Sequence, residues 1–167
     1  GDLEAETVVL AAGAWTTPLA ASIGIPIPME AGKGYSFSIQ PTVVPSHAVL
    51  LVDVHVGCTP FGDRLRIGGT MEFSGINNRL DRRRIASIVA GARQSFLPWK
   101  TPEIESEWAG MRPITADGLP VLDRAGDLEN TYIATGYSMQ GVTLAPTSGR
   151  ALAEMITTGR RPLLLEP

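Results

Sequence analysis

Apolar side chains recur at helical spacing in three parts of the chain. They predict helices at residues 16–23, 81–97 and 141–157. The middle helix is the clearest, because Asp81 is placed to cap its N-terminus and Pro98 follows its end. The last helix is expected to end before Gly159, a residue type that commonly terminates helices.

Short runs of β-branched and aromatic residues between turn signals predict strands. They cover residues 7–12, 34–40, 49–54, 64–69, 104–111 and 131–135. The first run is typical of a short buried strand, and the next three indicate an antiparallel sheet. Residues 159–167 are expected to form an extended tail. Together, these helices and strands predict an α+β fold with an antiparallel or mixed sheet.

The composition is that of a globular protein and argues against several kinds of partner. With 167 residues, of which 44% are hydrophobic, the chain can bury one sizeable core or two small ones. Its net charge of -3 comes from interspersed acidic and basic residues, so we expect no nucleic-acid partner. No apolar run approaches the roughly 20 residues of a membrane-spanning helix, so we expect no membrane anchor in this chain.

The few cysteine and histidine residues limit cross-links and metal sites. Cys58 is the single cysteine, so no internal disulfide is possible, and with two scattered histidines it cannot form a standard zinc site. We therefore expect no metal and a reducing compartment, the cytoplasm. Gly1 stands where a start methionine would, and a strand follows within a few residues, so we expect the first elements of the fold on a preceding segment.

One turn is a candidate ligand site. Residues 136–141 (Gly-Tyr-Ser-Met-Gln-Gly) lie between a predicted strand and a predicted helix, where backbone N–H groups carry partial positive charge that favours an anion or an electron-rich oxygen. A tight structural turn is the alternative. The spacing G-x-G-x-x-G, typical of dinucleotide sites, is absent from the chain.

Arg112 is a second candidate. It lies in an aromatic and apolar stretch, residues 108–113, where a guanidinium needs a partner because an unpaired buried charge is costly. A substrate carboxylate could bind it through two hydrogen bonds, and an internal salt bridge to one of the 17 acidic residues is the alternative.

The order and spacing of several motifs resemble those of a known enzyme family. The motifs are Glu6 to Trp15, Lys33-Gly34-Tyr35, Asp63 to Glu72, Trp108 to Pro120 and Gly136 to Pro146. They resemble the D-amino-acid oxidase superfamily of FAD-dependent enzymes, which includes glycine oxidase and sarcosine oxidase, and most closely the small subunit of bacterial D-amino-acid dehydrogenases. The resemblance covers nearly the whole chain and implies that it is the C-terminal portion of such an enzyme.

This resemblance implies a division of the chain. Residues 1–32 would be a returning piece of a Rossmann-like FAD-binding domain, and residues 33–128 a substrate-binding domain. Residues 129–158 would be the last strand and helix of the FAD-binding domain, followed by a tail at residues 159–167. The intact parent would be an α/β protein whose N-terminal FAD-binding segment is absent from this chain.

The resemblance also implies roles for individual residues. Arg112 would pair with the substrate carboxylate. The residues expected beside the FAD cofactor are Ala12, Gly13, Trp15, Gly136, Tyr137, Ser138, Met139, Gly141, Val142 and Thr143. Tyr137 stands where the family usually has histidine, and it is also a candidate for the catalytic site. Tyr35 either contacts the substrate or packs in the core.

By resemblance, the intact protein would oxidatively deaminate an amino acid. The α-hydrogen would leave as a hydride to flavin N5, and water would hydrolyse the imine to an oxo acid and ammonia. The absence of an evident His, Cys or paired-carboxylate site agrees with such cofactor chemistry. The isolated segment would be inactive, and the parent would lie in the cytoplasm or peripherally at the inner membrane.

Two other functions are compatible with the same residues. One is an amine oxidase similar to glycine or sarcosine oxidase, which shares the role of Arg112. The other is a non-catalytic binding or assembly module that keeps this fold. The amino acid, its chirality, the electron acceptor and the oligomeric state stay open.

Other polar residues have simpler explanations. Cys58 is expected to be an inert thiol rather than a flavin attachment point, and His47 and His55 are expected to have structural roles. The arginines at the start of the middle helix are expected to form a solvated face rather than a phosphate site. They are Arg79, Arg82, Arg83 and Arg84.

Overall fold

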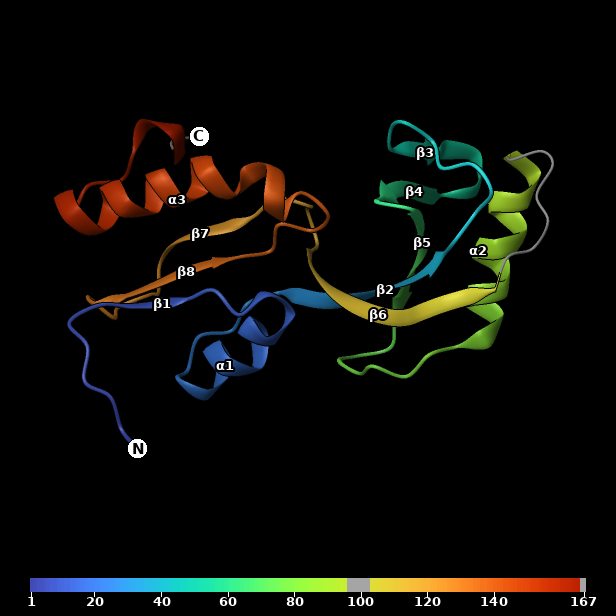
Figure 1. Ribbon diagram of the computed structural model, residues 1–167. Helices are drawn as coiled ribbons and strands as arrows, with labels where there is room; N and C mark the ends of the chain where they lie inside the picture. Colours follow the sequence, from blue (N-terminus) through green and yellow to red (C-terminus); the bar gives the residue numbers. More distant parts are fainter. Residues whose placement is uncertain (96–102, 166–167) are drawn as a thin grey trace. The chain divides into compact units, whose positions relative to one another are not determined.

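The computed structural model describes residues 1–95 and 103–165, which fall into two compact units. The terminal unit comprises Gly1–Ala31 and Arg112–Pro167, and the central unit comprises Gly32–Met111 (Figure 1). Each unit has its own cluster of buried apolar side chains, as expected for parts that pack separately. The fold is α+β, as the sequence predicts.

The terminal unit is built on a three-stranded sheet in the order β1-β8-β7. β1 (Val8–Leu10) pairs in parallel with β8 (Thr131–Thr135), and β7 (Val121–Arg124) pairs antiparallel with β8. α3 (Gly141–Thr158) covers one face of the sheet and α1 (Thr16–Ser22) lies on the other (Figure 1). The core of the terminal unit contains Leu10, Ala20, Ile27, Ala125 and Ile133.

The central unit is a five-stranded sheet in the order β3-β4-β5-β2-β6, with one helix packed against it. The strands are β2 (Met29–Ile39), β3 (Val49–Leu51), β4 (Val56–Phe61), β5 (Arg64–Phe73) and β6 (Ile104–Thr115). β3 pairs with β4, β4 with β5 and β5 with β2, all antiparallel, as predicted for the middle of the chain.

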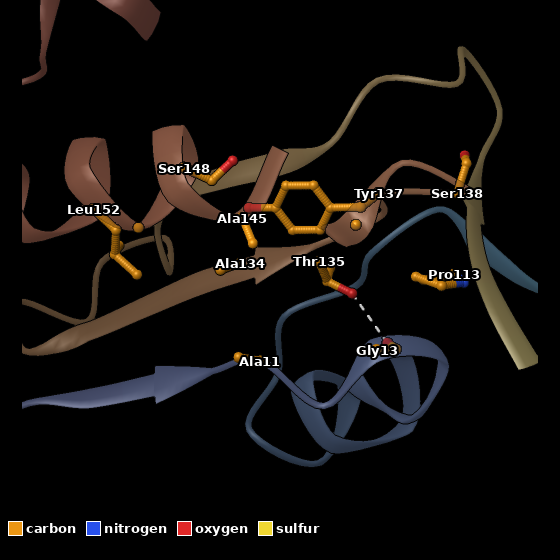
Figure 2. A pocket seen from close by; sticks show the side chains of 12 residues that line it. Ala11, Gly13, Pro113, Ala134, Thr135, Tyr137, Ser138, Ala145, Ser148 and Leu152 are labelled. Carbon is orange, nitrogen blue, oxygen red and sulfur yellow. Dashed lines mark hydrogen bonds between the residues drawn. The ribbon is translucent and has the colours of Figure 1, made fainter. Parts of the chain in front are cut away.

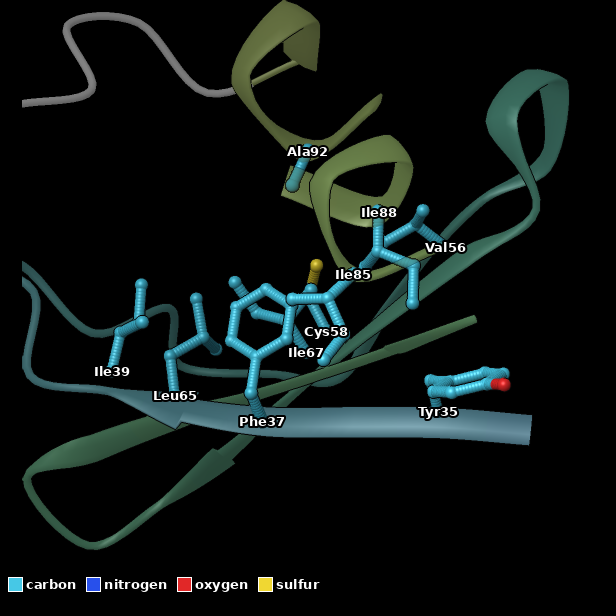
Figure 3. Packing of buried hydrophobic residues seen from close by; sticks show 10 residues of the cluster. All are labelled: Tyr35, Phe37, Ile39, Val56, Cys58, Leu65, Ile67, Ile85, Ile88 and Ala92. Carbon is cyan, nitrogen blue, oxygen red and sulfur yellow. The ribbon is translucent and has the colours of Figure 1, made fainter. Parts of the chain in front are cut away.

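The helix of the central unit is α2 (Arg82–Ser95), and it supplies Ile85, Ile88 and Ala92 to the core. Ile85, Ile88 and Ala92 lie three and four residues apart on one face of α2 and pack against strand residues such as Phe37 and Ile67 (Figure 3). The predicted cap is confirmed, because the Arg83 N–H donates a 2.8 Å hydrogen bond to Oδ1 of Asp81. The predicted end of the helix at Leu97 and Pro98 lies outside the described residues.

The remaining helix predictions are confirmed, with small shifts at the ends. α3 runs one residue beyond the predicted end and stops at Gly159, which has a φ of 69° and donates its N–H to the Met155 carbonyl at 3.0 Å. The tail is not wholly extended, because Leu163–Leu165 form a short 3-10 helix (η3).

The sequence patterns did not predict two of the strands, β4 and β7. The predicted strand at residues 49–54 ends at Leu51, and a 3-10 turn (η2, Val52–Val54) leads through His55, whose φ is 55°, into the unpredicted β4. Gly57 and Pro60 interrupt the β pattern of β4, and β7 has only four residues. Both strands are stabilised by pairing with partners that the local pattern does not specify.

Residues 112–128 belong to the terminal unit, where β7 is hydrogen-bonded to β8. The first strand, expected to be buried, leaves Val8 40% and Val9 39% exposed. Among the described residues, β1 has a neighbouring strand on one side only, which leaves these side chains accessible.

Candidate functional site

Two loops meet at one edge of the sheet in the terminal unit. β1 and β8 are parallel, so their carboxyl ends lie at the same edge, where β1 leads into a 3-10 helix (η1, Gly13–Trp15) and β8 leads into the turn before α3. Thr135 joins the two loops, because its Oγ1 donates a 3.0 Å hydrogen bond to the Gly13 carbonyl (Figure 2). Ligands of α/β sheets commonly bind at such carboxyl ends.

The turn after β8 requires a glycine and holds a strained residue. Gly136 has a φ of 78°, and an added Cβ would lie 2.7 Å from Cγ2 of Thr115. Ser138 has a left-handed φ of 51°, which is uncommon for a residue other than glycine. Its N–H donates a 3.0 Å hydrogen bond to the Pro113 carbonyl, which fixes the turn to β6. Backbone strain of this kind is concentrated at functional sites.

The N-terminus of α3 directly follows this turn. The N–H groups of Gly141, Val142 and Thr143 have no acceptor within the helix, and Leu144 is the first to bond back, to the Gln140 carbonyl at 2.9 Å. These groups carry partial positive charge, so the helix start can stabilise a negative charge or an electron-rich oxygen nearby.

A pocket of about 400 Å³ lies between α3 and the ends of β1 and β8 (Figure 2). It is lined by Ala11, Gly13, Pro113, Ala134, Thr135, Tyr137, Ser138, Gly141, Ala145, Ser148, Gly149 and Leu152. Most of these side chains are small and none is ionisable apart from the phenol of Tyr137. The volume lies in the range of small-molecule sites, and the lining suits a flat, largely uncharged group.

The structure brings together part of the predicted cofactor set. Gly13, Tyr137, Ser138 and Gly141 line the pocket. The predicted residues outside its lining are Ala12, Trp15, Gly136, Met139, Val142 and Thr143. Three of these have exposed apolar side chains, with 53% of Trp15, 73% of Met139 and 92% of Val142 accessible to solvent.

Sequence reasoning missed most of the α3 wall of the pocket. Ala145, Ser148, Gly149 and Leu152 line it together with Gly141. Their spacing of three and four residues places them on one face of the helix, and all but Leu152 are small. A search for small residues at helical spacing would have found this face.

Arg112 lies in β6 and is half-buried. Burial lowers the pKa of its guanidinium. A guanidinium can hold a carboxylate through two hydrogen bonds, so Arg112 is chemically suited to binding a small organic acid.

Tyr35 lies in an ionic network of the central unit. Its hydroxyl donates a 2.6 Å hydrogen bond to Oε2 of Glu72, and its side chain is 1% exposed. Glu72 also forms ion pairs with Lys33 (2.9 Å) and Arg84 (2.7 Å). The Lys33 ammonium donates further to Oδ1 of Asn77 at 2.9 Å. The Tyr35 hydroxyl therefore already has a hydrogen-bond partner within the central unit.

Glu72 and Lys33 are both charged at neutral pH. Hydrogen bonds from Ser74, Tyr35 and Lys33 lower the pKa of Glu72 to about 2. Burial by itself would lower the pKa of Lys33, but its hydrogen bonds to Glu72 and Tyr35 outweigh this effect and raise it. The residues of this network come from β2, β5 and α2, so no local sequence motif predicted the network.

Other polar residues behave largely as simple structural groups. Cys58 is fully buried, and burial raises the pKa of its thiol to about 11, in keeping with the expected inert thiol. His47 shares a 2.8 Å hydrogen bond with Ser46. The expected solvated arginine face is partly ion-paired, because Arg82 pairs with Glu107 and Arg84 pairs with Glu72.

The described residues include neither a membrane-spanning helix nor a metal-binding cluster. No helix there has both the length and the hydrophobicity to span a membrane. Across residues 1–95 and 103–165, no group of three or more His, Cys, Asp or Glu side chains is arranged to hold a metal ion.

Comparison with known proteins gives consistent similarities. The family model DAO, described as FAD dependent oxidoreductase, matches residues 1–155. A D-amino acid dehydrogenase from Bradyrhizobium diazoefficiens is 34% identical over 165 residues, which is 97% of this chain and 39% of that protein. Homologous stretches therefore extend over nearly all of this chain.

Solved structures give the same result. Glycine oxidase from Geobacillus kaustophilus superposes with a TM-score of 0.85 at 26% identity, over 93% of this chain and 42% of that one. Iminodiacetate oxidase from Chelativorans sp. superposes with a TM-score of 0.86 at 25% identity, over 98% and 46% respectively. The chain thus spans less than half the length of each of these relatives.

Proposed function

The chain belongs to the DAO family of FAD-dependent oxidoreductases, and from this premise we propose that it is the C-terminal part of an enzyme that oxidatively deaminates amino acids, in the manner of a D-amino acid dehydrogenase. The observation that carries the proposal is the pocket where β1, β8 and the start of α3 meet. The other support is Arg112, a half-buried cation suited to a carboxylate.

The residues around the pocket fit a flavin. An added Cβ would meet nothing within 4 Å at Gly13 and only Cβ of Tyr137, at 3.7 Å, at Gly141, so a planar ring can approach the backbone closely at both positions. The N–H groups at the start of α3 would stabilise negative charge on the edge of such a ring. When bound, FAD would accept a hydride from the α-carbon of the substrate.

The residues of this chain would bind and orient the substrate and the cofactor. Arg112 would hold the substrate carboxylate through two hydrogen bonds and so fix the position of the α-carbon. Tyr137, with its ring in the pocket lining, would lie beside the cofactor. The pocket lining has no His, Cys, Asp or Glu side chain, so these residues would position the reactants and exclude water rather than exchange protons.

We propose that the terminal unit is part of an FAD-binding domain and the central unit a substrate-binding domain. A preceding segment would supply the strand, turn and helix that grip the ADP half of FAD. The open edge of β1, with Val8 and Val9 about 40% exposed, supports this proposal, as does the greater length of the relatives. The 167-residue chain alone would bind FAD weakly and be inactive.

We propose that the intact protein lies in the cytoplasm, and peripheral association with the inner membrane through its electron acceptor is the alternative. Cys58, a free and buried thiol, is compatible with a reducing compartment.

The test is an anaerobic absorbance spectrum of the intact, FAD-loaded protein mixed with D-amino acids, glycine or sarcosine. We expect one class of substrate to bleach the oxidised flavin band, and Arg112→Ala to slow the bleaching roughly a hundredfold or more by weakening substrate binding. Arg150→Ala, on the exposed surface of α3, is the matched control and should behave like the parent. An unchanged spectrum with every amine would contradict the proposal and favour a non-catalytic module.

A second candidate is an amine oxidase acting on glycine or sarcosine. The structural likeness to glycine oxidase favours it. The same substrate panel, repeated with oxygen, separates the two, since an oxidase would reoxidise its flavin rapidly in air and a dehydrogenase would not.

A further inference from the structure

The polar side chains that line the pocket of the terminal unit all end in a hydroxyl group. They belong to Thr135, Tyr137, Ser138 and Ser148, and among the described residues the lining contains no Lys, Arg, His, Asp or Glu. A phosphate group is usually held by basic side chains in addition to backbone N–H groups. The pocket is therefore better suited to a neutral group that carries hydroxyls than to a phosphate.

The backbone around Tyr137 is fixed by contacts within the terminal unit. Tyr137 forms an isolated antiparallel bridge with Ile114. Its carbonyl accepts a 2.8 Å hydrogen bond from the Gln140 N–H, and the next N–H, that of Ser138, donates to the Pro113 carbonyl at 3.0 Å. The starting point of the Tyr137 side chain is thus set before a ligand binds, which lowers the entropy that binding costs.

The phenol ring of Tyr137 extends from this turn into the space between α3 and β8 (Figure 2). On the side of α3 it meets small residues. An added Cβ at Gly141 would lie 3.7 Å from Cβ of Tyr137. Ala145, which lines the same pocket, is four residues or about 6 Å further along the helix. These small residues leave room for a ligand beside the phenol.

The Tyr137 hydroxyl is available to such a ligand. It has no hydrogen-bond partner among residues 1–95 and 103–165, whereas the Thr135 hydroxyl already donates to the Gly13 carbonyl. A tyrosine whose ring is partly buried commonly has a hydrogen-bond partner for its hydroxyl. A hydroxyl group of a ligand can both donate to a phenol and accept from it, so a polyol chain would supply this partner.

We propose that the pocket binds the riboflavin half of FAD and that the Tyr137 hydroxyl is hydrogen-bonded to the ribityl chain, the polyol that joins the flavin ring to the diphosphate. The inference rests on the proposed function, in which the N–H groups at the start of α3 face the edge of the ring that becomes negative on reduction. The ribityl chain is attached to the ring nitrogen next to that edge. It therefore starts within about one helical turn of Gly141, along the part of α3 that borders Tyr137.

The test uses the intact protein stripped of FAD. It is titrated with riboflavin and with lumiflavin, which has the same ring without the polyol, and flavin fluorescence reports binding. Tyr137→Phe keeps the phenyl ring and removes the hydroxyl. It should weaken riboflavin about fivefold and leave the affinity for lumiflavin within about twofold of the parent value. FAD, which carries the same polyol, should be weakened by the same factor as riboflavin.

Tyr132→Phe is the matched control. Tyr132 lies on β8 in the same unit and is 5% exposed, but it is not part of the pocket lining. Its substitution should leave the affinities for riboflavin and lumiflavin within about twofold of the parent values.

A second pair of variants tests the same space without changing Tyr137. Ala145→Leu adds volume to the α3 wall of the pocket and should weaken riboflavin about tenfold or more. Ala153→Leu makes the same change on an exposed part of α3 outside the lining and should leave riboflavin binding unaltered. Circular dichroism of each variant checks that the fold is kept.

The outcomes separate this inference from the proposed function. If the stripped protein rebinds FAD but no amino acid reduces the flavin, the proposed reaction is wrong, and the titrations still decide the role of Tyr137. Equal losses of riboflavin and lumiflavin in Tyr137→Phe, or no loss of either, would overturn the hydrogen bond to the ribityl chain. A protein that rebinds FAD but shows no affinity for riboflavin would overturn the assignment of the pocket to the riboflavin half.

Discussion

Thr135 and Gly13 are 122 residues apart in the chain, yet the Thr135 hydroxyl donates a 3.0 Å hydrogen bond to the Gly13 carbonyl. Thr135 is 1% exposed and ends β8, and Gly13 begins the loop after β1. This one contact ties together the two loops that border the candidate cofactor pocket.

Thr135→Val should therefore loosen the pocket. Valine keeps the shape of the side chain and removes the donor, while the Gly13 carbonyl still accepts the backbone N–H of Thr16. We expect the free energy of unfolding to fall by about 1 kcal/mol and FAD to dissociate more readily from the intact protein. Urea unfolding and a flavin-binding titration measure the two effects.

Thr157→Val is the control for that substitution. The Thr157 hydroxyl bonds to the Ala153 carbonyl at 2.8 Å on the exposed side of α3. Losing this hydrogen bond should change the free energy of unfolding by less than about 0.5 kcal/mol. Equal effects of the two substitutions on FAD binding would argue against a special role for the Thr135 to Gly13 contact.

Gly136→Ala should strongly destabilise the protein. An alanine at a φ of 78° is strained, and its Cβ would lie 2.7 Å from Cγ2 of Thr115. We expect a loss of about 3 kcal/mol, measured by urea or thermal unfolding.

Gly149→Ala is the matched substitution for the same measurement. An added Cβ there meets nothing within 4 Å, and the residue lies inside α3, so the higher helix propensity of alanine should stabilise the protein by up to about 1 kcal/mol. The prediction fails if both alanines shift stability in the same direction.

Glu72→Gln should destabilise the central unit. It removes the counter-ion of Lys33, whose side chain is 3% exposed and would remain as a poorly compensated buried charge. The expected cost is about 3 kcal/mol in urea unfolding. Glu105→Gln, which breaks the half-exposed pair of Glu105 with Arg64, should cost less than about 1 kcal/mol. A small effect at both positions would mean that the Lys33 to Glu72 pair contributes little.

The same pair predicts how stability depends on pH. The pKa of Glu72 is about 2 in the folded protein against an ordinary value of 4.5, so the folded state binds fewer protons than the unfolded chain between these values. Its contribution is therefore complete above about pH 4.5 and is lost as the pH falls towards 2. Urea unfolding of the parent and of Glu72→Gln from pH 6 to pH 2 should show a stability difference that shrinks with acidification. A difference that stays constant over this range would contradict the prediction.

Local patterns were enough for much of the fold. The α2 helix and its Asp81 cap, the start of α3 at Gly141 and its stop at Gly159, and β8 depend on residues close together in sequence. Helix periodicity, capping and turn propensity are properties of neighbouring residues, so the sequence alone carries them. The motifs of the FAD-dependent family could be recognised for the same reason.

Local sequence patterns did not predict the contacts between distant segments. β4 and β7 have weak patterns of their own and exist because β5 and β8 offer them backbone partners. The Lys33 to Glu72 pair joins residues of different strands, and the bonded hydroxyl of Tyr35 depends on it. Sheet register decides these contacts, and it is set by the packing of a whole unit.

By itself, the sequence determined the class of fold, most helix limits and the family. Only the tertiary structure decided which small residues line one pocket and how Thr135 reaches Gly13. The physical reason is that glycine, alanine and serine carry little local signal, and their effect on function comes from the space that distant segments leave above them.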